Sequence, residues 1–233
     1  MTTLLLVRHG LTAMTGPVLA GWTPGVDLDE RGRAQVRDLG ARLAPVPVAA
    51  VVSSPLDRCV RTAEAVAAGR PGTAGKVELD ERFGEVRYGD WTGRPLKELA
   101  EEPLWKVVQA HPSAARFPGE DGEALADAAH RAVTAVRDWN ARIAAEHGKD
   151  AAYVVCSHGD IIKAIVADAM GLHLDQFQRI QVAPASLTVI RYTELRPFLS
   201  RLNDIGGNVQ DLLPPPPEEK DGDDGDAAIG GGA

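Results

Sequence analysis

Two apolar runs that lie far apart in the chain each end at a histidine-glycine pair, and no other feature constrains the fold as strongly. Residues 2–7 run directly into Arg8 and His9, and residues 151–156 lead through one serine into His158. Short apolar runs that end in turn residues are typical of strands buried on both faces of a parallel sheet. Because ligands bind at the carboxyl ends of strands in such sheets, we expect the two histidines to meet at one sheet edge.

Further strand-like runs alternate with segments in which apolar residues recur at helical spacing. Strands are also predicted over 49–53, 77–79 and 186–191, the last one in the chain. Helices are predicted from an Asp29 N-cap to about Pro45, and over 56–68, 96–109, 122–147 and 161–170. This alternation predicts an α/β fold, specifically a three-layer α/β/α sandwich with a mainly parallel central sheet.

The negative charge of the chain is concentrated at its C-terminal end. The last 22 residues hold six carboxylates and one lysine, so −5 of the net charge of −8 lies there and −3 in the rest. A four-proline run at 214–217 precedes this acidic, glycine-rich stretch, which cannot bury enough apolar surface to order itself. We therefore divide the chain into a catalytic domain over 1–205 and a disordered, Pro-rich acidic tail over 206–233.

Composition argues against several classes of protein. No continuous apolar stretch of the 233-residue chain approaches the roughly 20 residues that span a bilayer. Since a signal-peptide core is also missing, we expect a cytoplasmic protein without a membrane partner. The net negative charge argues against nucleic acid as a partner. Cys59 and Cys156 are too few for a disulfide framework or a four-ligand zinc site, and we interpret them as reduced core residues.

Four short segments together hold the types of side chain that cleavage of a phosphate monoester requires. A nucleophile must attack phosphorus, fixed cations must hold the equatorial oxygens, and an acid must protonate the leaving oxygen. Histidine suits the nucleophile because its ordinary pKa of about 6.5 leaves it mostly neutral. Arginine suits the clamp because its planar fork stays charged. The segments are 8–10, 54–58, Glu85 with two nearby glycines, and 157–159.

The same segments bear on whether the site needs a metal ion. Two arginines and a protonated second histidine would supply about three positive charges, enough to replace a metal. No carboxylate cluster in the sequence has the spacing of metal ligands. We therefore expect a site that uses neither a metal nor a cofactor.

In this order, the segments resemble the histidine phosphatase superfamily, also called the phosphoglycerate-mutase-like family. The resemblance extends from Leu4 to about Tyr192. The matching residues are 4–12, 28–32, 53–63, 85–93 and 157–159. The resemblance implies a metal-independent phosphatase that acts on a small phosphorylated metabolite.

The resemblance also implies a role for each matching residue. His9 is the residue that becomes phosphorylated, and Arg8, Arg58 and His158 form the phosphate pocket. Glu85 is the general acid and then the base that activates water. Outside the pocket, the neighbours of Arg58 at positions 61 and 62 are expected to hold that arginine in place.

Four positions depart from the family pattern and bear on the substrate. Leu11 and Thr15 replace the family's frequent Glu or Gln and its phosphate-contacting Asn, although the Thr15 hydroxyl can still donate a hydrogen bond to phosphate. The mutases carry a threonine at the position of Ala20 and a lysine at that of Leu96, and a paired-arginine segment that has no counterpart here. We therefore favour a phosphatase over a 2,3-bisphosphoglycerate-dependent type of phosphomutase, and both over an inactive binding module of the same fold.

The remaining expectations concern the surroundings of the site. The segment 83–120 is predicted to cover the pocket and to select the leaving group, and Gly21 is expected to contact the substrate. Trp91 is interpreted as an anchor of its loop rather than as a pocket wall. Asp160 is interpreted as the cap of the helix that follows it, rather than as a group that tunes His158. A homodimer is left open.

Overall fold

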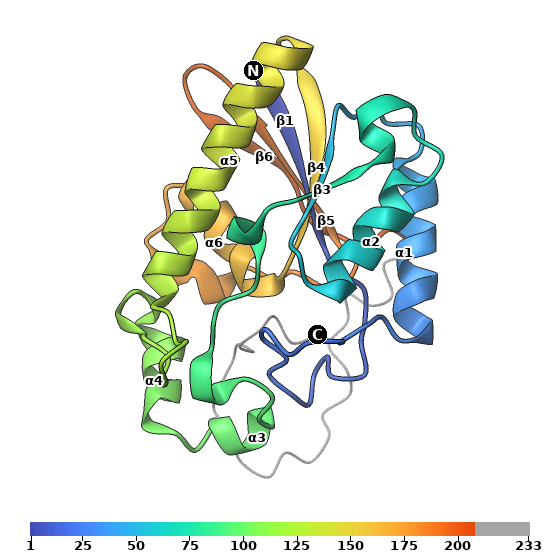
Figure 1. Cartoon of the computed structure of the whole chain (residues 1–233). Coiled ribbons are helices and arrows are strands. Elements are labelled where there is room, and N and C mark those ends of the chain that lie inside the picture. The colour runs from blue at the N-terminus through green and yellow to red at the C-terminus, as the bar shows by residue number, and fades with distance from the viewer. Residues whose placement is uncertain (208–233) are drawn as a thin grey trace.

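A six-stranded sheet forms the centre of the computed structural model, which describes residues 1–207. The strand order is β3-β2-β4-β1-β5-β6, with helices on both faces (Figure 1). The strands are β1 (Thr2–Arg8), β2 (Val51–Ser53), β3 (Val77–Leu79), β4 (Ala151–Ser157), β5 (Leu187–Tyr192) and β6 (Pro197–Asp204). The pairs β1–β4, β4–β2 and β2–β3 are parallel, whereas β5 pairs antiparallel with both β1 and β6. The predicted three-layer α/β fold with a mainly parallel sheet is confirmed; the predicted disorder of the tail lies outside the described residues from position 208 onward.

Strand β1 shows why the fold has two helical layers. Its side chains alternate between the faces of the sheet, so Leu4 and Leu6 join one apolar cluster while Leu5 and Val7 join the other. All four are buried, as expected for a central parallel strand. The register with β4 runs from Thr2 opposite Ala151 to Arg8 opposite Ser157, so both strands end at the same level.

The helices form one layer on each face of the sheet (Figure 1). One layer holds α1 (Glu30–Leu43) and α2 (Asp57–Ala67), and the other holds α5 (Leu125–His147) and α6 (Gly159–Ala169). Asp29 caps α1, because its side chain accepts a hydrogen bond from the Gly32 N–H. Gly32 has no side chain because a Cβ there would collide with the carbonyl oxygen of Leu11. This close approach fixes the loop that follows His9.

The segment 83–120 lies beyond the carboxyl edge of the sheet (Figure 1). It contains α3 (Leu96–Leu99) and α4 (Pro103–Ala110), where the sequence predicts one helix over 96–109. The helix breaks because Pro103 cannot continue it: the ring has no N–H and would clash with the preceding turn, so it starts a new helix instead. Trp91, Trp105 and Phe117 are buried against one another here.

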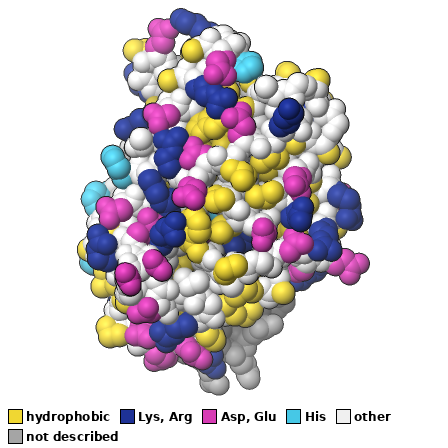
Figure 2. Space-filling model, in the orientation of Figure 1, with side chains coloured by type: hydrophobic (Ala, Val, Ile, Leu, Met, Phe, Trp, Pro, Cys, Tyr) yellow, Lys and Arg dark blue, Asp and Glu magenta, His cyan; other side chains and the backbone are white. Residues whose placement is uncertain are grey.

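Short 3₁₀ helices complete the chain between these elements. They are η1 (Gly72–Gly75), η2 (Glu81–Phe83), η3 (Gly89–Trp91), η4 (Pro112–Ala114) and η5 (Leu174–Arg179). The face in Figure 2 carries interspersed acidic and basic side chains over α5. The ion pairs Arg142–Glu78 and Arg82–Asp138 link α5 to β3 and η2. No helix within residues 1–207 is long and apolar enough to cross a membrane.

The expectation that the strand at 186–191 is the last one is wrong. β6 follows it and pairs antiparallel with β5 at the edge of the sheet. Much of β6 faces solvent, and Phe198 and Leu202 remain more than 40% exposed. Because a largely exposed edge strand needs no continuous apolar run, its sequence gives no strand signal.

Candidate active site

His9 and His158 meet at the carboxyl ends of β1 and β4, as their positions after two apolar strands predict. The His9 N–H donates to the carbonyl oxygen of Ser157 at 3.1 Å, which ties the two strand ends together. The two imidazole rings stand edge to face with centroids 5.3 Å apart. Both residues are buried, so the rings lie in a site with little access to water.

The hydrogen bonds of His9 define which ring nitrogen can act as a nucleophile. Nδ1 lies 2.8 Å from the carbonyl oxygen of Gly10, and because a carbonyl only accepts, Nδ1 carries the proton. Nε2 therefore keeps its lone pair. The pKa of His9 lies well below 6.5, chiefly because burial disfavours the charged form and secondarily because Arg58 and Arg8 are close. His9 is thus neutral at physiological pH, which is the state a nucleophile needs.

Two buried guanidinium groups flank the histidines. Arg8 Nη1 donates to the carbonyl oxygen of Val182 at 2.7 Å, and Arg58 Nη2 donates to that of Gly21 at 2.8 Å. Burial lowers the pKa of Arg8 to about 10, so it remains charged at neutral pH. Nε and Nη1 of Arg58 are buried and have no hydrogen-bond partner among residues 1–207. Buried donors that lack an acceptor are costly, and an anion in the pocket would satisfy them.

The hydrogen bonds of His158 determine its tautomer in the ligand-free protein. Nη2 of Arg58 lies 3.2 Å from Nδ1, which must accept because a guanidinium only donates. Nε2 then carries the proton and donates to Ser54 Oγ at 2.8 Å. The pKa of His158 is well below 6.5 because of burial and then of Arg58. The lowered pKa favours a neutral His158 in the ligand-free protein, and its charged form beside a bound phosphate stays a prediction.

Glu85 is the carboxylic acid of the site, and its pKa is raised to about 7. The largest cause is burial, followed by the negative charge of Asp160; the Val86 N–H, which donates to Oε1 at 3.0 Å, and the two arginines act in the opposite direction. Oε2 lies 3.9 Å from Nδ1 of His158. A carboxylic acid that is half protonated near neutral pH is suited to donate and accept a proton in turn.

Two residues that the sequence analysis does not single out hold Glu85 in place. The Trp22 indole N–H donates to the backbone carbonyl of Glu85 at 2.6 Å. Nη2 of Arg131, on α5, donates to the same carbonyl at 2.9 Å and pairs with Glu123 at 2.7 Å. Only their position in space identifies them as residues that support Glu85.

Asp160 is not the helix cap that the sequence suggests. It lies inside the first turn of α6, whose N-cap is His158. Its buried carboxylate accepts a hydrogen bond from the Tyr88 hydroxyl at 2.8 Å and lies 3.5 Å from Nζ of Lys163. The charge of Asp160 acts on Glu85 instead, where it helps to raise the pKa.

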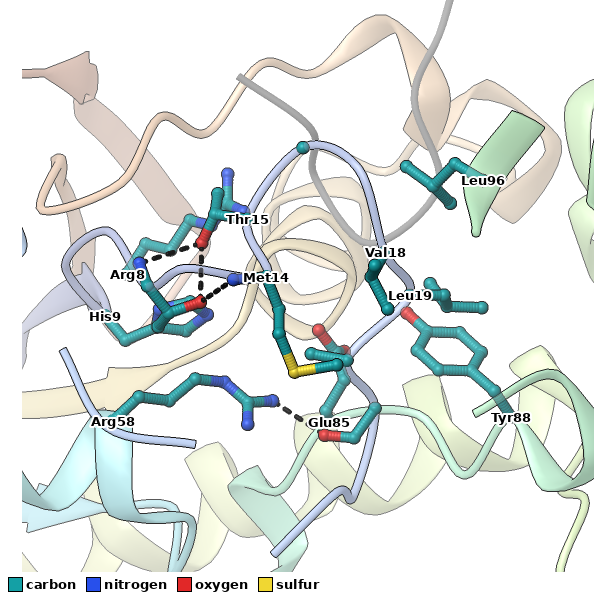
Figure 3. A pocket seen from close by; sticks show the side chains of 14 residues that line it. Arg8, His9, Met14, Thr15, Val18, Leu19, Arg58, Glu85, Tyr88 and Leu96 are labelled. Atoms are coloured by element: carbon teal, nitrogen blue, oxygen red, sulfur yellow. Dashed lines mark hydrogen bonds between the residues drawn. The ribbon is translucent and has the colours of Figure 1, made fainter. Parts of the chain in front are cut away.

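A pocket of about 400 Å³, mouth included, opens onto these groups (Figure 3). Arg8, His9, Arg58 and Glu85 line it, and so do Thr15 and Gly21. The Thr15 hydroxyl is engaged with Thr12, since Oγ1 lies 3.0 Å from the Thr12 hydroxyl and accepts from its N–H.

His158 lies one layer behind the pocket, against Arg58 and Ser54. The apolar part of the lining, which includes Met14, Val18 and Leu19, is not predicted from the sequence. Trp91 does not line the pocket and anchors the core beside Trp105, as its interpretation requires.

Two further expectations concern cysteines and metals. Cys59 and Cys156 are buried, and neither forms a disulfide. The Cys59 thiol lies behind the site, where it donates to the carbonyl oxygen of Ser157 at 3.4 Å. Within residues 1–207, no group of three or more His, Cys, Asp or Glu side chains is arranged to hold a metal ion.

Comparison with known proteins places this geometry among phosphatases and mutases. The family model of the histidine phosphatase superfamily (branch 1) matches residues 4–205. A glucosyl-3-phosphoglycerate phosphatase of Mycolicibacterium vanbaalenii is 31% identical over 184 residues, covering 75% of this chain and 76% of the relative. A phosphoserine phosphatase 1 of Hydrogenobacter thermophilus is 30% identical over 214 residues, covering 87% and 92%.

One solved structure and one mutase complete the comparison. YhfR of Bacillus stearothermophilus has a TM-score of 0.76 at 27% identity, covering 88% of this chain and 98% of that one. A 2,3-bisphosphoglycerate-dependent phosphoglycerate mutase 2 of Gloeobacter violaceus is 29% identical, covering 78% of this chain and 82% of the relative.

Proposed function

The chain belongs to the histidine phosphatase superfamily and is a phosphatase, and we propose that it hydrolyses small phosphate monoesters through a phosphohistidine at His9 without a metal ion. One observation carries the proposal. His9, whose Nε2 keeps its lone pair, lines one pocket with two buried guanidinium groups and a carboxylic acid whose pKa is about 7. We assign this activity to a catalytic domain over 1–205, in which the segment 83–120 covers the pocket.

In the first step, His9 Nε2 attacks phosphorus and the bond from phosphorus to the ester oxygen breaks. Arg8 and Arg58 hold the equatorial oxygens, on which negative charge is spread. The protonated carboxyl of Glu85 gives its proton to the departing oxygen, so that the product leaves as a neutral alcohol. The site then holds a phosphohistidine and a Glu85 carboxylate.

In the second step, the Glu85 carboxylate takes a proton from water while the water oxygen attacks phosphorus. The bond from phosphorus to Nε2 breaks, and the products are inorganic phosphate, neutral His9 and a protonated Glu85. The pKa of about 7 supports both roles, because neither protonation state of Glu85 is costly near neutral pH. Gly10 keeps the proton on Nδ1 in both steps, so the reactive nitrogen does not change.

A phosphomutase is the second candidate, since one relative is a mutase. A mutase must hold a second anionic group while the phosphohistidine waits for its acceptor. Among the described residues that line the pocket, Arg8 and Arg58 are the only cations, and both are needed for the transferred phosphoryl group. This lining favours water as the acceptor.

Hydrolysis of p-nitrophenyl phosphate tests the proposal. We expect turnover that EDTA does not change, and a loss of about 10,000-fold or more in kcat for His9→Ala. His130→Ala is the matched control, because His130 is exposed on α5. Inhibition by EDTA would refute the metal-free mechanism. Turnover by His9→Ala at the wild-type rate would remove His9 from the reaction.

A further inference from the structure

The pocket has two chemically different ends. The buried ionic groups Arg8, His9, Arg58 and Glu85 form one end. The other end carries Met14, Val18, Leu19, Ala20 and Leu96, which we call the apolar wall. Figure 3 shows the Met14 side chain reaching toward Glu85, with Val18, Leu19 and Leu96 beyond it. A leaving group that extends away from phosphorus toward Glu85 therefore meets apolar side chains next.

The apolar wall is a fixed structure, because backbone hydrogen bonds join its two segments. The Leu19 N–H donates to the carbonyl of Arg94 at 3.0 Å, and the Gly93 N–H donates back to that of Leu19 at 2.8 Å. The Leu96 N–H donates to the carbonyl of Pro17 at 2.9 Å. Leu19 is itself buried in the core. The loop over 14–20 and the start of α3 thus present one preformed surface.

The charged side chains near the apolar wall are engaged elsewhere. Arg94 pairs with Glu102 at 2.8 Å, and the Arg87 guanidinium stacks 4.0 Å from the centre of the Trp22 ring. Neither arginine lines the pocket. Within the described lining, both cations and the one carboxylate, Glu85, therefore lie at the ionic end beside His9, which we call the phosphate end.

We infer that the substrates of this enzyme are phosphate monoesters of uncharged alcohols whose first carbons are apolar, and that the apolar wall excludes esters with a nearby carboxylate. This inference rests on the proposed phosphatase function. A carboxylate at the wall would lose water without gaining a hydrogen-bond donor from the side chains of the wall. A methylene group, by contrast, is favoured there because it leaves water for an apolar surface.

Two substrate series test the inference on the wild-type enzyme. From ethyl to butyl phosphate, each added methylene group should raise kcat/KM about twofold to fourfold. The fourfold value corresponds to full burial of the methylene group. The methyl ester of 3-phosphoglycerate should exceed 3-phosphoglycerate by about 10-fold or more, since the pair differs mainly in the charge. A preference for the acid would overturn the inference. If neither these esters nor p-nitrophenyl phosphate reacted, the phosphatase function itself would fail.

Substitutions in the apolar wall provide the second test. Leu96→Lys should lower the ratio of kcat/KM for the methyl ester to kcat/KM for 3-phosphoglycerate by about fivefold or more, because the lysine supplies a cation at the wall. Leu195→Lys adds the same charge at a site that is 86% exposed and outside the lining, so it should leave the ratio unchanged. Met14→Lys repeats the test from the other segment if Leu96→Lys does not fold. Equal ratios in the wall variants and in Leu195→Lys would overturn the role of the wall.

Discussion

The two ends of the pocket are built in opposite ways, although both belong to one continuous surface. At the phosphate end, buried charged groups are held by the ends of central strands and by α2. At the apolar wall, uncharged side chains are presented by a loop and a four-residue helix. The phosphate end can therefore be shared by phosphatases with many substrates, while the wall sets which alcohol fits. The difference separates reaction chemistry from selectivity in the same cavity.

Electrostatics distinguishes the two ends as sharply as composition does. Burial lowers the pKa of both histidines and raises that of Glu85, so it favours the neutral form of all three groups at the phosphate end. Shifts of this kind are concentrated at functional sites. The wall contributes no titratable group, so substitutions there should alter specificity without changing the pH dependence.

Removal of the Arg58 side chain should reduce kcat/KM more than any of the substitutions described below. Arg58→Ala is expected to reduce kcat/KM about 1,000-fold for every monoester, because the charge and the donors that face the phosphoryl oxygens are lost. Arg61→Ala is the matched control on the same helix. Arg61 was expected to hold Arg58 in place, but its side chain is exposed and pairs with Glu64 instead. A loss limited to one substrate would place Arg58 in leaving-group selection and break the comparison.

Glu85→Gln should act next most strongly and should depend on the leaving group. We expect a loss of about 100-fold in kcat/KM for butyl phosphate at pH 6, and a much smaller loss for p-nitrophenyl phosphate, whose leaving group needs no proton. In the wild type, the rate for butyl phosphate should fall about tenfold per pH unit above about 7, as Glu85 loses its proton. A pH profile with no basic limb near 7 would contradict the assignment of Glu85 as the acid.

The same substitution should change stability in a pH-dependent way. The folded-state pKa of Glu85, about 7, is raised above its ordinary 4.5, so its contribution to stability is full below pH 4.5 and is lost as the pH rises to 7. Relative to wild type, Glu85→Gln should therefore gain about 2 to 3 kcal/mol in the free energy of unfolding between pH 5 and pH 8. Denaturant unfolding at both pH values measures the difference, with Glu64→Gln as the exposed control.

Truncation of the apolar wall should have the smallest effect. Leu96→Ala is expected to reduce kcat/KM for butyl phosphate by about threefold to tenfold, because apolar contact with the leaving group is lost. Ethyl phosphate should be affected less, since its chain reaches less of the wall. An equal loss for both esters would indicate that Leu96 supports the fold of α3 rather than the leaving group.

The sequence predicts the phosphate end far better than the wall, for a physical reason. His9 and His158 each follow a buried strand, and parallel strands place their ends together, so short-range patterns suffice to locate them. Met14 and Leu96 line one pocket because backbone hydrogen bonds join the loop over 14–20 to residues 93–96. An apolar residue in a loop carries no sign of whether it lines a pocket or packs in the core.

The protonation states and hydrogen-bond partners of the site residues could not be predicted from the sequence either. A motif does not reveal that Arg58 donates to Nδ1 of His158, a contact that disfavours a second proton on that ring in the ligand-free protein. The interpretation of Asp160 as a helix cap is wrong because its hydrogen-bond partner, Tyr88, lies in a distant segment of the sequence. β6 was missed because its exposed side chains form no apolar pattern.

The central claim is that the phosphoryl group passes through His9, and trapping the intermediate tests it most directly. The enzyme would be mixed with p-nitrophenyl phosphate, quenched in alkali, where phosphohistidine survives, and digested for mass spectrometry. We predict that His9 is the one phosphorylated residue. The modification should disappear from the wild-type enzyme once the substrate is exhausted, and it should not form in His9→Ala. Turnover with phosphate on another residue, or with no phosphorylated residue under conditions that trap phosphohistidine in a known family member, would contradict the account.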